Sequence, residues 1–373
     1  MLNFDVAALR LIGLSNAQVQ QALQAQLDES PLNSPNPSKY FLMRATEVHR
    51  ETIVLHDGQL NKPASEHVRA RVHPSLVRVL IDGQSGIAVG DWIICYQDEH
   101  RHWWVNQILA PTTQIIRRDG DGRRHIVVSN IDMVFIVMGL DHDFSPRRLE
   151  RYLALIHASG EGIMPIVVLT KADQCLDTDS ALDQLRDRIP SHVPIHCVNG
   201  LADETRAELL PYLIASQTIV LLGSSGAGKS TLTNNLMQQT IQDTGAVRVG
   251  DSRGKHTTTA RSLHCLEGGA CIIDTPGVRT LRPDTDEQTL TGSFADIDAL
   301  SKQCRFSNCT HNTEPDCAVR AGVIPDRLRN YQKLLRDVRR DTLTPLQKQT
   351  QQREWRTRSK AGRARLKQKT NEG

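Results

Sequence analysis

The pattern of hydrophobic and polar positions changes character along the 373-residue chain. From Tyr40 to about Leu109, short runs of β-forming residues are separated by turn-forming sequences such as "HDGQ" and "IDGQSG". Five such runs occur: "FLMRATEV", "TIVLH", "HVRARVH", "DWIICYQ" and "WWVNQIL". Five short strands in succession predict a small β-barrel, with the OB-fold as the leading candidate.

From about Asn130 the pattern becomes an alternation of apolar and amphipathic runs. The apolar runs "IDMVFIVMG", "MPIVVLT", "PIHCV", "QTIVLLG" and "ACIIDTPG" predict buried strands. Between them, "SPRRLERYLALIHASG", "ALDQLRDRI", "ADETRAELLPYLI" and "KSTLTNNLM" predict helices, and "ARSLHCLE" precedes the last apolar run. This alternation predicts an α/β domain with a mainly parallel sheet that is covered on both faces.

The two ends of the chain differ from these central parts. Ser15 and the following "NAQVQQALQAQL" predict a helix, which the proline-rich "SPLNSPNPS" terminates. Near the other end, "PDRLRNYQKLLRDVRRD" predicts a helix with one apolar face. That face is formed by Leu328, Tyr331, Leu335 and Val338. We therefore expect an N-terminal helix and linker (1–39), a barrel (40–113), an α/β domain (114–280), an α-helical domain (281–344) and a basic tail (345–373).

The composition is that of a globular protein without membrane segments. No stretch approaches eighteen uninterrupted apolar residues, and the start of the chain lacks the pattern of a secretory leader, so we expect a cytoplasmic protein. Eight cysteines in a chain of this length do not indicate a disulfide scaffold. Five of them lie singly in or beside apolar segments and are expected to be core thiols: Cys95, Cys175, Cys197, Cys265 and Cys271.

The charge of the chain is unevenly distributed. Residues 345–373 contain nine Lys or Arg and two Glu, which gives this tail a charge of +7 and leaves −4 for residues 1–344. A run of this kind neutralises phosphate groups with a salt-dependent affinity. The alternative is a solvated tail that serves solubility alone.

A phosphate-binding motif lies directly after the apolar run "TIVLL". The sequence "GSSGAGKST" fits the pattern G-x-x-x-x-G-K-[ST], whose glycines let backbone N–H groups point at phosphate oxygens. In this pattern Lys229 reaches the β- and γ-phosphates and the Ser230 hydroxyl binds Mg²⁺. The expected nucleotide contacts are Gly223, Ser224, Ser225, Gly226, Ala227, Gly228, Lys229, Ser230 and Thr231.

A second motif, "IIDTPG", ends the next predicted strand. Asp274 is placed to hold Mg²⁺, and the Gly277 N–H to contact the γ-phosphate. The polar segment "RGKHTTT" between the two motifs supplies a hydroxyl that can close on Mg²⁺ and the γ-phosphate. We expect Thr258 in this role, with Thr257 and Thr259 as alternatives.

The residue after Gly277 predicts that the isolated protein hydrolyses its nucleotide slowly. Many efficient GTPases have a Gln there that orients the attacking water, whereas this chain has Val278, which neither donates nor accepts. We therefore expect a partner to stimulate hydrolysis, with His256 helping to position the water.

A base-reading motif precedes the phosphate motif. In "TKAD", Asp173 can accept hydrogen bonds from the N1–H and amino group of guanine, and the aliphatic part of Lys171 can lie along the base, next to Ala172. Thr170 stands where most GTPases have Asn. Read cyclically from the phosphate motif, the order is the usual GTPase order cut before the base motif, with "CVNG" at the second base contact. Circular permutation leaves a parallel sheet intact when the new ends lie at the surface.

A cluster of metal-binding residue types follows the α/β domain. Cys304, Cys309, His311 and Cys317 lie within fourteen residues, among residues that favour loops. Three thiolates and one imidazole form a closed tetrahedral shell suited to structural Zn²⁺, with no open position for a catalytic water. The alternative is a trio of core cysteines.

These motifs together resemble one family. "TKAD", "GSSGAGKST", "RGKHTTT", "DTPG" and "CRFSNCTHNTEPDC" are similar to the circularly permuted ribosome small-subunit-dependent GTPase A family, also called YjeQ, from near residue 40 to near residue 341. The resemblance implies an OB domain, a permuted GTPase domain and a zinc-binding domain. It also implies a monomer that binds GTP or GDP, Mg²⁺ and one Zn²⁺, no membrane, and the small ribosomal subunit with its rRNA as partner. GTP hydrolysis stimulated by that subunit during its late maturation is the implied activity.

Two other functions are compatible with the motifs. A nucleotide-gated RNA-binding scaffold would have the same sites, with incidental hydrolysis, and blocking hydrolysis would then leave release unaffected. An ATPase would share the phosphate site, and Asp173 argues against it because adenine lacks the edge that a carboxylate recognises.

Overall fold

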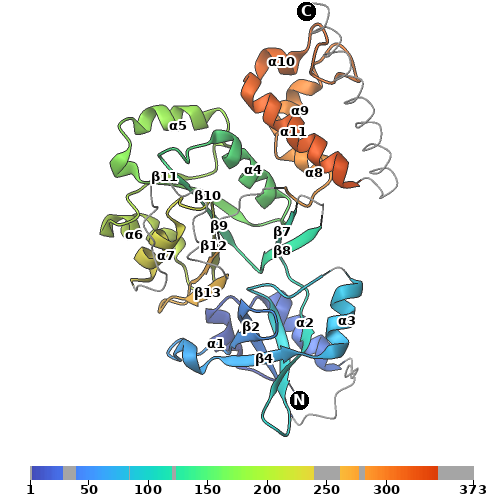
Figure 1. Ribbon diagram of the computed structural model, residues 1–373, viewed down its shortest axis with the longest axis vertical. Coiled ribbons are helices and arrows are strands. Elements are labelled where there is room, and N and C mark those ends of the chain that lie inside the picture. Colours follow the sequence, from blue (N-terminus) through green and yellow to red (C-terminus); the bar gives the residue numbers. More distant parts are fainter. Residues whose placement is uncertain are drawn as a thin grey trace, which may run out of the picture. The chain divides into compact units, whose positions relative to one another are not determined.

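The computed structural model describes residues 2–27, 39–83, 85–119, 123–238, 261–276 and 282–342. These residues form two compact units that divide between Asp284 and Thr285, and Figure 1 shows the elements of each. Within these ranges, none of the helices combines the length and the apolar character needed to cross a lipid bilayer.

The first unit contains a closed five-stranded barrel. Strand β2 hydrogen-bonds to both β3 and β5, so the order β2-β3-β4-β6-β5 returns to its start. The strands are β2 (Tyr40–Val48), β3 (Ile53–His56), β4 (Val68–Val72), β5 (Trp92–Gln97) and β6 (Trp103–Ile108). Met43, Ile93 and Cys95 point into the barrel interior, whereas Trp92 and Ile94 belong to the neighbouring core, as the alternation of side chains along a strand requires. The predicted barrel is confirmed.

A helix that the sequence analysis did not predict joins β4 to β5. Helix α3 (Pro74–Asp82) begins with Pro74 after His73, whose side chain accepts a hydrogen bond from the Ser75 N–H. Two 3₁₀ turns of the chain are η1 (Ala64–Glu66) and η3 (Leu210–Tyr212).

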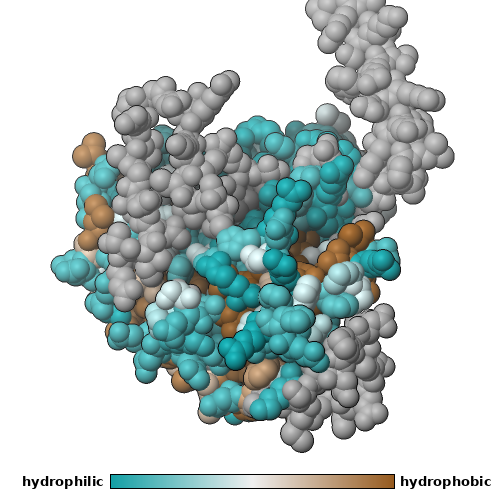
Figure 2. All heavy atoms as spheres, turned by 60° about the horizontal axis from the view of Figure 1, so that its bottom comes forward, coloured by the Kyte–Doolittle hydropathy of each residue, from teal (hydrophilic) through white to brown (hydrophobic). Residues whose placement is uncertain are grey.

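The outer face of α3 is hydrophobic. Figure 2 shows the molecule with the bottom of Figure 1 turned toward the reader. Hydrophobic side chains gather on the right of this view, at the same horizontal position as α3 in Figure 1. Val79 and Ile81 of α3 are 55% and 69% exposed.

The second part of this unit is a six-stranded α/β sheet with the order β11-β10-β9-β12-β14-β13. Its strands are β9 (Met133–Gly139), β10 (Met164–Thr170), β11 (Ile195–Cys197), β12 (Thr218–Leu222), β13 (Ser262–Cys265) and β14 (Cys271–Asp274). All neighbours are parallel except β13, which is antiparallel to β14. Strand β13 also pairs with β2 of the barrel, through Ser262 and Glu47, so barrel and α/β sheet are continuous.

Helices cover both faces of the α/β sheet, as predicted. On one face, Val134, Ile136 and Met138 of β9 share a core with α4 (Pro146–His157) and α5 (Thr178–Arg186). On the other, Phe135 and Val137 share a core with α6 (Asp203–Leu209) and α7 (Lys229–Met237). Successive residues of one strand serve opposite faces, which explains why these strands read as continuous apolar runs.

The N-terminal segment is part of the folded unit. It contains β1 (Leu2–Asn3), which pairs with β2, and the helices α1 (Val6–Leu11) and α2 (Asn16–Leu27). Only α2 was predicted.

A hairpin of β7 (Gln114–Arg118) and β8 (Arg124–Ser129) forms a separate two-stranded sheet. This hairpin was not predicted.

A buried arginine connects the N-terminal segment, the barrel and the α/β sheet. Arg44 of β2 is fully buried and donates to the carbonyl oxygens of Ile12 and, at 2.8 Å, of Asn130. Its guanidinium also lies 5.3 Å from the centre of the Trp92 ring. Because a buried charge needs several partners, these contacts fix the three segments relative to one another.

The second unit is helical. Its helices are α8 (Glu287–Gly292), α9 (Ala295–Ser301), α10 (Ala318–Gly322) and α11 (Pro325–Thr342). The buried face of α11 contains Leu328, Tyr331, Leu334 and Val338. The prediction placed Leu335 on this face instead of Leu334. Leu335 is only partly buried, because the helix turns through slightly less than four residues per turn and both positions border the face.

Candidate nucleotide and metal sites

Four sequence motifs meet at one edge of the α/β sheet. The base motif follows β10, "CVNG" follows β11, the phosphate loop follows β12, and "DTPG" begins at the end of β14. Because these strands are parallel, their carboxyl ends lie at the same edge. Motifs separated by up to about a hundred residues are thus brought together.

Glycines allow the phosphate loop to form in a narrow space. A Cβ at Gly223 would lie 2.3 Å from the Val137 carbonyl oxygen, so a side chain is excluded there. Gly228, at the start of α7, has φ +89°, a conformation that residues with a side chain rarely adopt. The loop therefore ends on the N-terminus of α7, where unpaired N–H groups favour an anion.

Lys229 lies inside this loop. It is 6% exposed, and its ammonium donates to the carbonyl oxygens of Gly223 at 3.1 Å and Ser224 at 2.7 Å. Burial lowers the pKa of Lys229 from its usual range. The charge is thus held next to the loop amides.

Ser230 and Asp274 form an oxygen pair that suits a divalent cation. The Ser230 hydroxyl donates to Asp274 Oδ2 at 3.4 Å. Asp274 is fully buried, and its Oδ1 atom has no hydrogen-bond partner within the described parts of the chain. Burial also raises the pKa of Asp274. A buried carboxylate oxygen without a donor is well explained by Mg²⁺, which prefers oxygen ligands.

The base motif is tied directly to the phosphate loop. The Thr170 hydroxyl is buried and donates to the Ala227 carbonyl oxygen at 2.7 Å. Lys171, with φ +61°, donates to the Gly226 carbonyl oxygen at 2.9 Å. Asp173 is exposed, in the 3₁₀ turn η2 (Ala172–Gln174). Thr170 therefore supports the loop from inside the protein, while the Asp173 carboxylate faces the outside.

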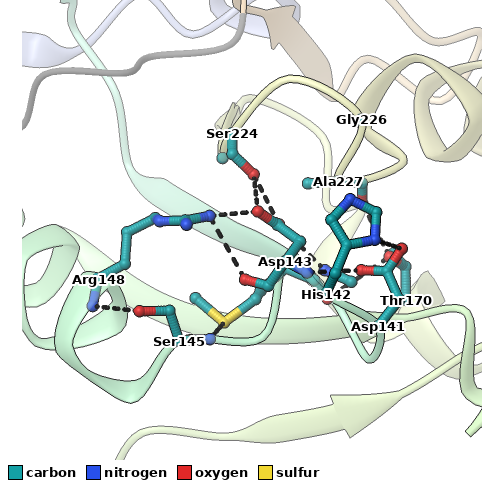
Figure 3. A network of polar contacts seen from close by, with 12 residues as sticks. Asp141, His142, Asp143, Ser145, Arg148, Thr170, Ser224, Gly226 and Ala227 are labelled. Carbon is teal, nitrogen blue, oxygen red and sulfur yellow. Dashed lines mark hydrogen bonds and ion pairs between the residues drawn. The ribbon is translucent and has the colours of Figure 1, made fainter. Parts of the chain in front are cut away.

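Figure 3 shows two further acidic residues at this edge, which the sequence analysis missed. Asp141 pairs with the Lys171 ammonium at 2.7 Å. Both oxygens of Asp143 lie 2.6 Å from the Ser224 hydroxyl, and the same carboxylate pairs with Arg148. The signal was present in "GLDHDFS", since two acidic residues directly follow a buried strand at the edge where the motifs lie.

We expect Asp143 and Ser224 to be energetically coupled. Ser224→Ala and Asp143→Asn should each destabilise the protein, and the double variant should lose less than the sum, with a coupling free energy of about 1–2 kcal/mol, since the hydroxyl donates to a charged acceptor. Urea unfolding measures all four proteins. Ser224→Ala combined with Asp187→Asn, an exposed residue at the end of α5, is the matched control and should be additive. Additivity of the first pair would contradict the coupling.

The "CVNG" segment lies beside the base motif and α7. The Ala172 N–H donates to the Val198 carbonyl oxygen at 3.2 Å. A Cβ at Gly200 would lie 3.7 Å from the Thr231 side chain. The predicted second base contact is therefore next to the first. Thr258, His256 and Gly277, the other predicted site residues, lie outside the described residues.

The Cys/His cluster of the second unit has the geometry of a tetrahedral metal site. The ligand atoms of Cys304, Cys309, His311 and Cys317 all lie within 4.8 Å of one another. Cys304 Sγ is 3.9 Å from Cys317 Sγ, and His311 Nδ1 is 3.6 and 3.4 Å from these two sulfurs. Ideal tetrahedral zinc requires S···S separations of about 3.8 Å and S···N separations of about 3.6 Å. The four residues therefore fit Zn²⁺.

The backbone at the cluster is specially held. His311 has φ +58°, unusual for a residue with a side chain. The Gln332 amide of α11 donates to the His311 carbonyl oxygen at 3.2 Å. Such strain persists where surrounding contacts or a ligand stabilise it.

The sheet order and the edge site define a P-loop GTPase domain in which the base motif precedes the phosphate motif. Two solved structures share this fold: YjeQ from Thermotoga maritima (21% identity, TM-score 0.56, covering 80% of this chain and 98% of that one) and YloQ, described as a circularly permuted GTPase (19%, 0.54, 84% and 99%).

Sequence comparison identifies the family. The RsgA GTPase family model matches residues 108–283. The small ribosomal subunit biogenesis GTPase RsgA of Xanthomonas axonopodis pv. citri is 43% identical over 303 residues, which are 79% of this chain and 80% of that protein. The protein of the same name from Xanthomonas oryzae pv. oryzae is 42% identical over 298 residues. This chain belongs to the RsgA GTPase family and is a GTP-hydrolysing enzyme.

Proposed function

We propose that the chain binds GTP at the edge site, hydrolyses it to GDP and phosphate when bound to the small ribosomal subunit, and acts late in the assembly of that subunit. The convergence of base motif, phosphate loop and Asp274 at one sheet edge carries the nucleotide part of this proposal. The names of the relatives support the ribosomal part.

The residues at the sheet edge have different roles in binding the nucleotide. Lys229 and the loop amides hold the phosphates, and Asp173 accepts hydrogen bonds from guanine. Ser230 and Asp274 would hold Mg²⁺, which supplies charge neutralisation at the β- and γ-phosphates. Thr170 and Lys171 keep the base motif in register with the phosphate loop through the Ala227 and Gly226 carbonyl oxygens. Thr258, Gly277 and His256 complete this proposal from the sequence alone.

The proposed partner is the rRNA of the small subunit. The +7 charge of residues 345–373 suits a phosphate backbone. One Zn²⁺ at the Cys/His cluster would give the second unit a fixed shape for docking. We propose that the protein acts as a monomer.

Nucleotide turnover with and without purified small ribosomal subunits tests the proposal. We expect slow GTP hydrolysis alone, strong stimulation by the small subunit, and little competition by ATP. Equal hydrolysis with and without subunits would reject the ribosomal part. Efficient ATP turnover would reject guanine recognition. If blocking hydrolysis leaves release from the subunit unchanged, the scaffold function is the better description.

Asp173→Asn should weaken GTP binding by at least about 100-fold. The carboxylate makes two hydrogen bonds to guanine in this proposal, and bonds to a charged group each contribute about 1.5–3 kcal/mol. The amide of Asn can donate to the 2-oxo group of xanthine, so XTP should bind better than GTP to the variant. Fluorescent-nucleotide titration measures both affinities. Asp179→Asn, an exposed position on α5, is the control. Unchanged GTP affinity in the Asp173 variant would show that the base is read elsewhere.

A further inference from the structure

Two cysteines face each other across the hairpin of β13 and β14. Cys265 ends β13, Cys271 begins β14, and the register pairs them directly. Their Sγ atoms are 3.4 Å apart. The Leu266 N–H donates to the Ala270 carbonyl oxygen, whereas the Cys271 N–H points away and donates to Gln217. The cysteines thus form a non-hydrogen-bonded pair, the type in which side chains lie closer together.

This geometry suits a disulfide. Cα atoms in a non-hydrogen-bonded pair are about 4.5 Å apart, and disulfides span Cα separations of about 4.4–6.8 Å. The sulfurs need only close from 3.4 Å to about 2.0 Å, which side-chain rotation can supply. Their hydrogen bond lowers the pKa of the Cys271 thiol and raises that of Cys265, so the two thiols interact directly.

We propose that Cys265 and Cys271 are an oxidation-sensitive dithiol that hydrogen peroxide converts to a disulfide. One sulfur attacks a peroxide oxygen, which breaks the O–O bond, releases one water and leaves a sulfenic acid. The other sulfur displaces the sulfenic oxygen as a second water and forms the S–S bond. Two thiols are oxidised by two electrons and one peroxide is reduced to two waters. Cys265 is only partly buried and gives the oxidant its approach, while Cys271 is fully buried.

The bridge would fix the register of β13 on β14. Strand β14 ends in Asp274, and β13 pairs with barrel strand β2. The cross-link would therefore restrain the strands between the barrel and the Mg²⁺ ligand. This consequence rests on the proposed function, whereas formation of the disulfide does not.

Peptide mapping tests the proposal on the full-length, zinc-loaded protein. Trypsin releases residues 262–279 as one peptide that contains both cysteines and no other. After hydrogen peroxide treatment, alkylation and digestion, this peptide should lack two hydrogens and carry no alkyl group. Treatment with dithiothreitol before alkylation should restore two alkyl groups.

Controls separate this pair from other thiols. The peptide containing Cys95, a buried thiol, should remain singly alkylated, and in Cys265→Ser the remaining Cys271 should be alkylated. Two alkyl groups on the oxidised wild-type peptide would overturn the proposal. A bridge from Cys265 to a cysteine of the zinc-type cluster, or a sulfinic acid at Cys265 beside an alkylated Cys271, would also overturn it. None of these readouts depends on GTP hydrolysis, so this proposal and the proposed function can fail separately.

Discussion

Lys229→Ala should lower kcat for GTP hydrolysis by about 10²–10³-fold. The reason is that an ammonium fixed beside the β- and γ-phosphates stabilises charge that develops in the transition state, and losing one such group costs this much in other enzymes. Lys229 is already held in the loop by two carbonyl oxygens, so little reorganisation precedes the reaction. Single-turnover hydrolysis with saturating small subunits measures the effect.

The control for Lys229→Ala is Lys333→Ala, which removes an exposed lysine of α11. It should leave hydrolysis without ribosomal subunits unchanged. Thermal unfolding checks that the Lys229 variant still folds, since the loop loses two hydrogen bonds. A folded variant with kcat within threefold of the original protein would rule out this role for Lys229.

Loss of zinc should unfold the second unit while the first remains folded. Structural zinc contributes about 10–16 kcal/mol in small zinc-binding peptides, more than the helices α8 to α11 can replace with their small core. Cys317→Ser, or a strong chelator, should therefore make residues 285–342 exchange amide hydrogens rapidly. GTP binding by the first unit should change less than threefold. Zinc content and hydrogen exchange by mass spectrometry are the measurements.

Cys197→Ser is the matched control, because Cys197 is a partly buried thiol outside the cluster. It should keep one zinc per chain and slow exchange in the second unit. Purified protein with no zinc and a protected second unit would show that the cluster folds without metal.

The sequence predicted most of the elements because their periodicities are strong. The barrel strands were predicted because apolar and polar residues alternate along them. The strands of the α/β sheet were predicted because they are continuously apolar and buried on both faces. Helix α3 was missed because "PSLVRVLID" is short and contains the β-branched residues Val77, Val79 and Ile81, which are typical of strands. The hairpin of β7 and β8 was missed because the charged, glycine-containing segment "RRDGDGRRH" at its turn is typical of a loop.

The site was predicted less completely than the fold. Motifs predict which residues approach the nucleotide, but the contacts that support those residues depend on the packing of loops. Asp143 holds Ser224 only because β9 is adjacent to β12 in the sheet, and the sequence does not state which strands are neighbours. Thr170 illustrates the same point. Its hydroxyl donates to the Ala227 carbonyl oxygen, so a side chain shorter than that of Asn is long enough to make this contact with the phosphate loop.

The permuted order also has a consequence for the growing chain. Strands β9, β10 and β11 are neighbours in the sheet and follow one another along the chain, so the half of the sheet that carries the base motif can pair before the phosphate loop is synthesised. During that interval the backbone N–H and C=O groups on the other edge of β9 are unpaired, because β12 has not yet been synthesised. All seven residues of β9 are buried in the finished protein. An apolar edge of this kind is prone to pair with other chains. Synthesis of residues 198–222 is therefore a period in which the nascent protein needs protection from aggregation.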